Sequence, residues 1–163
     1  MTLILSKKYN PLFESKARYF IITGGRGSGK SFAVTVFLTL LTMSRGIRVL
    51  FTRFTMTSAH LSIIPEFLEK IGLLGFDEVF SVNKSEVVNL KNKSDILFRG
   101  IKTSAGNQTA SLKSLTGVSN WILDEAEELV DENIFDTIDL SIREKNIQNR
   151  VILILNPVTK EHW

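Results

Sequence analysis

The sequence predicts an α/β fold with a mainly parallel central sheet that is covered by helices. Short apolar runs alternate with longer segments of helical periodicity, which is typical of strands buried under helices on both faces. A glycine-rich segment, 24–31, lies between the apolar run 19–23 and a helical segment. Two adjacent carboxylates, Asp124 and Glu125, end a later apolar run. The 163 residues suit one domain, so we expect a single domain over 1–163.

The apolar runs place four strands, each predicted to be buried on both faces. They are 19–23, 47–52, 121–123 and 151–155. Residues 79–99 alternate between β-branched and polar positions and predict an inserted β-hairpin of two or three antiparallel strands. Residues 1–17 are expected to be irregular, and the polar stretch 101–116 to be a loop.

Three helices are expected between these strands. The first covers 31–44, with Gly46 as its C-cap. In the second, Pro65 either kinks the helix or marks a late start. Its apolar face is predicted to comprise Leu61, Ile64, Leu68 and Ile71. The third is predicted to bury Ile134, Ile138 and Ile142.

Composition excludes several kinds of site. The chain has no cysteine and only two histidines, so disulfides, thiolate metal sites and cysteine nucleophiles are excluded and a histidine metal site is disfavoured. The net charge of +3 weakly favours anionic partners such as nucleic acid. No apolar stretch is long enough to predict a membrane span, and we expect a cytoplasmic protein.

The glycine-rich segment fits the phosphate-binding pattern G-x-x-x-x-G-K-[ST]. Glycines allow consecutive backbone N–H groups to turn toward an anion, and the following helix adds its N-terminal dipole. In this pattern Lys30 contacts the β- and γ-phosphates of ATP, and Ser31 is a ligand of Mg²⁺. The residues predicted to bind the phosphates are Gly24, Gly25, Arg26, Gly27, Ser28, Gly29, Lys30 and Ser31. Arg26 either stabilises charge on the γ-phosphate during hydrolysis or is simply exposed, and its position alone leaves both open.

The acidic pair ends its strand where an open α/β sheet holds its ligand. We expect Asp124 to hold Mg²⁺ and Glu125 to activate the attacking water as catalytic base. Glu127 and Glu128 are interpreted as solvated charges. Asn156 follows the last strand and either senses the γ-phosphate or is a turn residue before a proline.

One segment imitates a guanine-binding motif. Residues 92–95 read Asn-Lys-Ser-Asp, which matches N-K-x-D, but they precede the acidic pair instead of following it. We interpret the segment as a hairpin turn.

These motifs together resemble the large terminase subunits of tailed phages, the ATPases that drive DNA into capsids. The resemblance covers nearly the whole chain and includes an arginine within the phosphate loop, which favours a role for Arg26. The segments that carry it are Gly24–Ser31, Thr52-Arg53, Ile96–Gly100, Leu115–Gly117, Ile122–Ala126, Arg143, Leu155–Pro157 and His162-Trp163.

The resemblance implies an additional-strand (ASCE) P-loop ATPase that translocates double-stranded DNA. It implies Lys30, Arg26 and Glu125 as catalytic residues, Ser31 and Asp124 on Mg²⁺, and Asn156 as the coupling residue. Implied partners are double-stranded DNA, the portal protein and the small terminase subunit, with a homo-oligomeric ring in the host cytoplasm. Some relatives supply an arginine in trans from the loop before the acidic strand; here the nearest basic residue is Lys113, which lacks bidentate geometry.

The family also has a nuclease domain, and its cluster of catalytic aspartates is not expected in these residues. We therefore expect no nuclease activity from them. Three other functions stay open: a helicase- or recombinase-like motor, a nucleotide-regulated assembly module without turnover, and a small-molecule kinase. Phe13 and Arg18 are candidates for contacting the base of the nucleotide.

Overall fold

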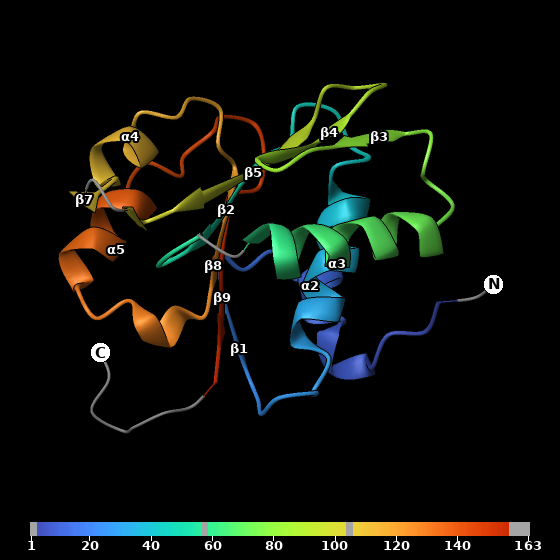
Figure 1. The fold of residues 1–163 in the computed structure, drawn as a ribbon, viewed down its shortest axis with the longest axis horizontal. Helices are drawn as coiled ribbons and strands as arrows, with labels where there is room; N and C mark the ends of the chain where they lie inside the picture. Colours follow the sequence, from blue (N-terminus) through green and yellow to red (C-terminus); the bar gives the residue numbers. More distant parts are fainter. Residues whose placement is uncertain (1–2, 57–58, 104–105, 157–163) are drawn as a thin grey trace.

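The computed structural model describes residues 3–56, 59–103 and 106–156. Seven strands form one twisted sheet in the order β1-β9-β8-β2-β5-β4-β3 (Figure 1). The strands of this sheet are β1 Tyr19–Thr23, β2 Arg48–Arg53, β3 Phe80–Val82, β4 Glu86–Asn89, β5 Asp95–Gly100, β8 Asn120–Asp124 and β9 Arg150–Leu155. The first five in spatial order run parallel; β4 pairs antiparallel with β5, and β3 pairs antiparallel with β4. The predicted parallel sheet with an inserted hairpin is therefore confirmed.

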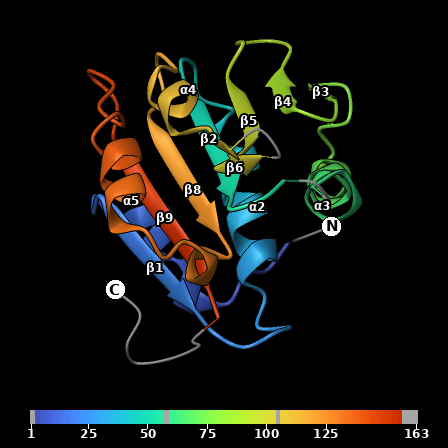
Figure 2. The same cartoon turned by 60° about the vertical axis from the view of Figure 1, so that its left-hand side comes forward.

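Helices cover both faces of the sheet, as Figure 2 shows. α2 and α3 pack on one face, and α4 and α5 pack on the other. The helical segments are η1 Lys7–Tyr9, α1 Pro11–Glu14, α2 Lys30–Leu41, α3 Ala59–Leu73, α4 Thr109–Lys113, η2 Ala126–Glu128 and α5 Glu132–Asp139. Within the described residues, no helix is long and apolar enough to cross a bilayer.

The two faces of the sheet build two separate cores because side chains alternate along each strand. On β2, Val49 and Phe51 face α2 and α3, whereas Leu50 between them faces α4 and α5. All three are almost fully buried. The central strands therefore need apolar side chains on both faces, and this is why their continuous apolar runs predicted strands from the sequence.

The strand before the phosphate loop differs from its prediction. β1 lies at the edge of the sheet and pairs with β9 alone, so it is not buried on both faces. Phe20 is buried under α2, but Tyr19 is 51% and Ile21 66% exposed on the other face. An apolar run indicates a strand, but it does not tell which strands become its neighbours.

Two predicted helix features are also wrong. α2 ends at Leu41, and its C-cap is Thr42, whose backbone N–H donates to Leu38. Gly46 has a φ of 79° and lies in the turn that leads to β2, beyond the helix. The hydroxyl of Thr42 bonds back to helix carbonyls, and this satisfies the end of the helix without a glycine.

α3 turns a different face to the core than predicted. Pro65 lies inside it, neither at its start nor at its end. Phe67 is fully buried, and Ile64 and Ile71 are buried as predicted, but Leu68 is 51% exposed. The side chain of Leu61 lies outside the described residues. The face of α3 that is buried is therefore determined by the large aromatic ring of Phe67, and the i, i+4 series of aliphatic residues did not predict it.

The middle of the chain contains more structure than predicted. The segment 101–116, expected to be a loop, holds a short hairpin of β6 Lys102–Thr103 and β7 Gly106–Asn107, followed by α4. Leu112 of α4 is buried and packs into the same core as the apolar side chains of α5, which holds this short helix against the sheet. A single apolar residue among polar ones carries too little periodicity to predict a helix.

The amino-terminal edge of the parallel strands holds a polar network. Asn92 donates to the carbonyls of Thr42 and Met43, and Ser94 donates to the carbonyl of Ser44. Lys93 has a φ of 65° in this tight turn between β4 and β5. The predicted hairpin turn is confirmed, and Asn92 and Ser94 hold the end of α2 in place instead of reading a base.

Candidate nucleotide-binding site

Four neighbouring parallel strands end at the same edge of the sheet, and each end supplies part of one site. β1 leads into the phosphate loop, and Asn156 follows β9. β8 ends in Asp124, which Glu125 follows, and β2 ends in Arg53. Because parallel strands share one carboxyl edge, segments separated by more than a hundred residues meet there.

The phosphate loop has the backbone that its glycines predict. Gly27 and Gly29 have φ values of 74° and 81°, a region that other residues rarely adopt. Gly29 is the N-cap of α2, so the helix begins at Lys30 with its free N–H groups at the loop. The side chain of Ser28 lies 2.9 Å from where a Cβ on Gly24 would be, which leaves no room there for a side chain.

Lys30 is buried and its ammonium group is held in the loop. The Nζ atom donates to the carbonyl oxygens of Gly24 and of Gly25, the latter at 3.1 Å. It also donates to Asn156 Oδ1 at 3.0 Å. These neutral acceptors hold the positive charge of Lys30 inside the loop, where it can attract the phosphates of a nucleotide.

The N-terminal segment supports the loop from outside. The hydroxyl of Tyr9 donates to the carbonyl of Ser28 at 2.9 Å, and Lys8 Nζ donates to the same oxygen at 3.1 Å. Sequence reasoning treated 1–17 as irregular and missed both contacts. A tyrosine and a lysine in a short helical turn carry no motif, so no sequence signal could have found them.

These parts surround a cavity of about 440 Å³. All but one of the residues predicted to bind the phosphates line it, as do both carboxylates of the acidic pair. The lining residues are Gly25, Arg26, Gly27, Ser28, Gly29, Lys30, Ser31, Phe32, Arg53, Glu66, Asp124, Glu125, Ile154, Leu155 and Asn156.

Arg53 binds both members of the acidic pair. Its Nη2 atom lies 2.7 Å from Asp124 Oδ2, and its Nε atom lies 3.6 Å from Glu125 Oε2. Nη1 donates to Ser62 Oγ at 3.2 Å, which connects the pair to α3. Asp124 is almost fully buried, so this guanidinium compensates a charge that would otherwise be costly inside the protein. In the sequence, Arg53 stood out only as part of the Thr52-Arg53 segment of the family resemblance, and no pattern predicted its contact with the acidic pair.

Glu125 has an unusual backbone. Its φ of 55° and ψ of 45° lie in the left-handed region, at the point where β8 turns into η2. Burial raises the pKa of the Glu125 carboxyl above its ordinary value, while Arg53 lowers it and Asp124 raises it further. A carboxyl whose pKa is raised is a better proton acceptor once it is ionised, as a general base requires.

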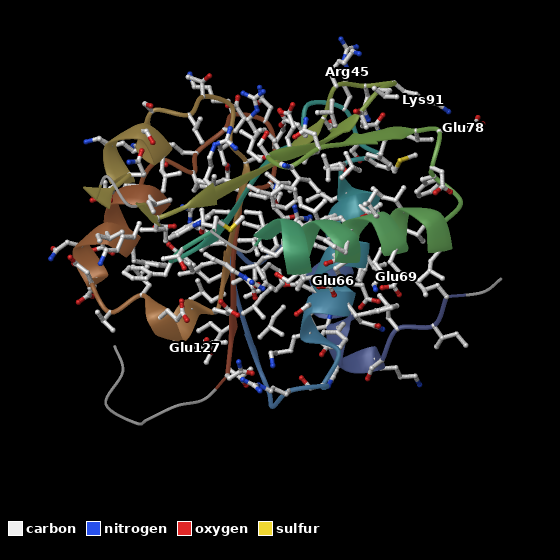
Figure 3. The ribbon with its side chains drawn as sticks, viewed as in Figure 1. Arg45, Glu66, Glu69, Glu78, Lys91 and Glu127 are labelled. Carbon is white, nitrogen blue, oxygen red and sulfur yellow. The ribbon has the colours of Figure 1, made fainter. Side chains whose placement is uncertain are left out.

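Glu66 is a further carboxyl that sequence reasoning missed. It lies on α3, lines the cavity together with the acidic pair, and appears near the centre of Figure 3. Burial raises the pKa of Glu66 as well, with a lowering contribution from Lys70 and a raising one from Asp124. An acidic residue in a helix of mixed composition gives no signal in the sequence.

The residues present fit a magnesium ion. Ser31, Asp124 and Glu66, which carry a hydroxyl and two carboxyl groups, line both the main cavity and a small cavity beside it, whose other walls are mainly apolar. Hard oxygen donors of this kind are what Mg²⁺ prefers, and it usually takes one or two carboxylates together with phosphate oxygens and water.

Asn156 and Glu127 are also brought together. Asn156 Nδ2 donates to Glu127 Oε1 at 3.0 Å, and the neighbouring Glu128 is exposed. The interpretation of Glu127 as a solvated charge is therefore wrong, although that of Glu128 agrees with the structure. Glu127 belongs to η2, which packs against β9, the strand that leads into Asn156.

Four other candidates lie in different places. Arg26 is exposed and lines the cavity in the phosphate loop. Lys113 is exposed at the end of α4 and does not line the cavity. Arg18 is bound to Asp139, and Phe13 packs edge-on against Phe37. Neither of the last two lines the cavity, so the structure does not support them as contacts of the base.

The fold and the site define a P-loop NTPase: a phosphate loop follows β1, an acidic pair ends β8, and a polar residue follows β9, the strand between them. The family of phage terminase large subunits matches residues 16–163. The chain therefore belongs to the phage terminase large subunit family.

Known relatives agree with this assignment. The terminase large subunit of Bacillus phage SPP1 is 26% identical over an alignment of 145 residues, and the match covers 80% of this chain and 33% of the relative. The large terminase of a thermophilic bacteriophage superposes with a TM-score of 0.78 at 14% identity, over 99% of this chain and 41% of that one. The Thermus phage P74-26 large terminase ATPase domain gives 0.66 at 18% identity, over 96% and 71%. The chain thus spans about a third of the length of its curated relative.

Proposed function

We propose that this chain is the ATPase motor domain of a DNA-packaging terminase, which hydrolyses ATP and uses the energy to translocate double-stranded DNA. The observation that carries the proposal is the convergence of Lys30, Asp124 and Glu125 on one cavity at the carboxyl edge of the sheet. Membership of the terminase family supports the link to DNA packaging. Structures of the thermophilic bacteriophage large terminase in complex with ADP and with ATP-gamma-S support a nucleotide as the ligand.

In the proposed reaction, a water molecule attacks the γ-phosphorus of ATP. A bond forms between the water oxygen and phosphorus, and the bond from phosphorus to the β,γ-bridging oxygen breaks, which releases ADP and inorganic phosphate. Glu125 accepts the proton of the attacking water. Lys30 and the N–H groups of the loop hold the phosphates, and Arg26 stabilises the charge that develops on the γ-phosphoryl group.

Mg²⁺ would be held by Ser31 and Asp124 and would neutralise phosphate charge. Arg53 occupies one oxygen of Asp124 through its guanidinium group, so Asp124 must be shared between the two cations or released by Arg53. In this proposal Arg53 orients the acidic pair and keeps both carboxylates at the cavity.

The assignment is tested by ATP turnover of the purified chain, with and without double-stranded DNA. We expect Glu125→Gln to lower turnover by about 10²–10⁴-fold while ATP binding persists, because a positioned general base contributes on that order. We expect Lys30→Ala to weaken ATP binding itself, because it removes the buried charge of the loop. Turnover by Glu125→Gln at the parent rate would refute the assignment of the base.

Two alternatives give different results in the same assays. ATP binding without turnover, even with DNA and partners, would indicate a nucleotide-regulated assembly module. ATP-dependent separation of DNA strands would indicate a helicase-like motor. We further propose that residues 1–163 act as the ATPase unit without nuclease activity, and cleavage of plasmid DNA by the purified chain would contradict this.

We also propose that the motor works as a homo-oligomeric ring on the portal protein, delivered to DNA with the small terminase subunit. Lys113 is exposed and does not line the nucleotide cavity of its own chain, so in this proposal it acts on the site of a neighbouring copy in the ring. A mixture of Lys30→Ala and Lys113→Ala chains on the portal tests this. If Lys113 acts in trans, mixed rings should hydrolyse ATP faster than rings of either variant alone, because an intact loop then faces an intact Lys113. Rings of Lys113→Ala alone that match the parent would contradict the role.

A further inference from the structure

We propose that Glu127 is a positioning residue, which links the phosphate-binding lysine through Asn156 to the turn that holds the catalytic base. The inference rests on the proposed ATPase function but concerns a residue to which that function assigns no role. Lys30 Nζ donates to Asn156 Oδ1 at 3.0 Å, and Asn156 Nδ2 donates to Glu127 Oε1 at 3.0 Å. One amide group thus bridges a cation in the phosphate loop and an anion beside Glu125.

The chemistry of the three groups fixes the orientation of the bridge. A lysine ammonium only donates hydrogen bonds, and an ionised carboxylate only accepts them. Asn156 must therefore turn its oxygen toward Lys30 and its NH₂ group toward Glu127. Because both end groups are charged, both hydrogen bonds are stronger than bonds between neutral groups, and each polarises the other through the amide.

Glu127 lies on the same short turn as the catalytic base. η2 begins immediately after Glu125, and the N–H of Glu128 donates to the carbonyl of Glu125 at 2.9 Å. Glu125 itself has the left-handed backbone that most side chains avoid, so the surrounding turn must hold it there. The hydrogen bond from Asn156 ties this turn, where Figure 3 labels Glu127, to the strand end beside the phosphate loop.

A nucleotide changes the first link of this chain of contacts. In the structure, Lys30 directs its donors to the loop carbonyls and to Asn156. When the ammonium group of Lys30 turns to a phosphate, its hydrogen bond to Asn156 weakens. The position of the Asn156 side chain is then set by its hydrogen bond to Glu127 alone. The position of η2, and with it that of the Glu125 carboxyl, then depends on whether phosphate is bound.

The test compares Glu127→Gln with Glu128→Gln. The two changes remove the same charge from adjacent residues of η2, but Glu127 contacts Asn156, whereas Glu128 is exposed. We expect Glu127→Gln to lower kcat for ATP about tenfold and to change KM by less than about twofold, because the base is misplaced while the phosphate loop is intact. The charges of Glu127 and Glu128 both raise the pKa of Glu125, so Glu128→Gln controls for that electrostatic effect. It should lower kcat much less than Glu127→Gln does and should keep KM. Thermal unfolding of both variants checks that they are folded.

A double-mutant cycle tests the link itself. If Asn156 and Glu127 act through one contact, Asn156→Ala combined with Glu127→Gln should lower kcat no further than Asn156→Ala alone. Effects that multiply, or a loss of kcat in Glu128→Gln equal to that in Glu127→Gln, would overturn the proposal.

A second measurement does not require turnover. The side-chain NH₂ resonance of Asn156 in ¹⁵N-labelled protein should shift in Glu127→Gln and not in Glu128→Gln. Addition of ATP-gamma-S should shift it in the parent. An Asn156 resonance unaffected by Glu127→Gln would overturn the inference. A chain that binds and hydrolyses no ATP would instead overturn the proposed function, while this comparison would still decide whether Glu127 holds Asn156.

Discussion

Glu125 is the residue at which the function and the stability of this chain oppose each other. Burial raises the pKa of its carboxyl in the folded protein. A raised folded pKa stabilises the protein below the pKa of the unfolded chain, and that contribution is lost as the pH rises through the folded pKa. Ionisation of the base therefore occurs at the expense of stability.

This gives a prediction on pH dependence. From about pH 4 upward, through the raised pKa of Glu125, the free energy of unfolding of the parent should fall relative to that of Glu125→Gln. Urea denaturation of both proteins in EDTA, at several pH values, measures the difference. A difference that stays constant with pH would contradict the raised pKa.

The residues of the site were predictable where their signal is local. Lys30 and Ser31 follow from the spacing of one loop, and Asp124 from the end of one apolar strand. Glu66 and Glu127 were not predictable, because their roles arise from contacts with residues far away in the chain. A carboxylate on a helix or turn looks the same in the sequence whether it faces solvent or a site.

At the scale of elements, α3 shows the limit of periodicity. The pattern identified the helix, but it assigned Leu68 to the core face, where Phe67 lies instead. Two other rings pack against Phe67, with centroids 6.1 Å away for Phe51 and 5.3 Å for Phe98. The aromatic cluster fixes how the helix is rotated about its axis, and no count of i, i+4 positions contains that information.

The two side chains should differ sharply in their contribution to stability. We expect Phe67→Ala to lower the free energy of unfolding by about 3–5 kcal/mol, since it opens a cavity in a packed core. Leu68→Ala should cost less than about 1 kcal/mol, because that side chain is half exposed. Chemical denaturation followed by circular dichroism gives both values. Equal losses would show that the face of α3 is assigned wrongly.

For the whole molecule, ligand binding and folding are coupled. A nucleotide that binds only the folded chain should raise its stability by about 2.7 kcal/mol at a hundred times its Kd. We expect ATP-gamma-S with Mg²⁺ to raise the Tm of the parent and of Lys91→Ala, whose exposed side chain lies at the far edge of the sheet (Figure 3). Lys30→Ala should lose most of the increase. A thermal-shift titration measures all three, and an equal increase in Lys30→Ala would contradict the site.

The polar network at the amino-terminal edge of the strands has a practical consequence. Arg45 and Lys91 project from that edge, while Glu127 marks the opposite one, where the nucleotide cavity lies (Figure 3). The chain contains no cysteine, so one cysteine introduced at either position would be its only thiol. A dye or a surface tether attached there would lie at the edge of the sheet opposite the nucleotide cavity, so the phosphate loop and the acidic pair would stay accessible to nucleotide.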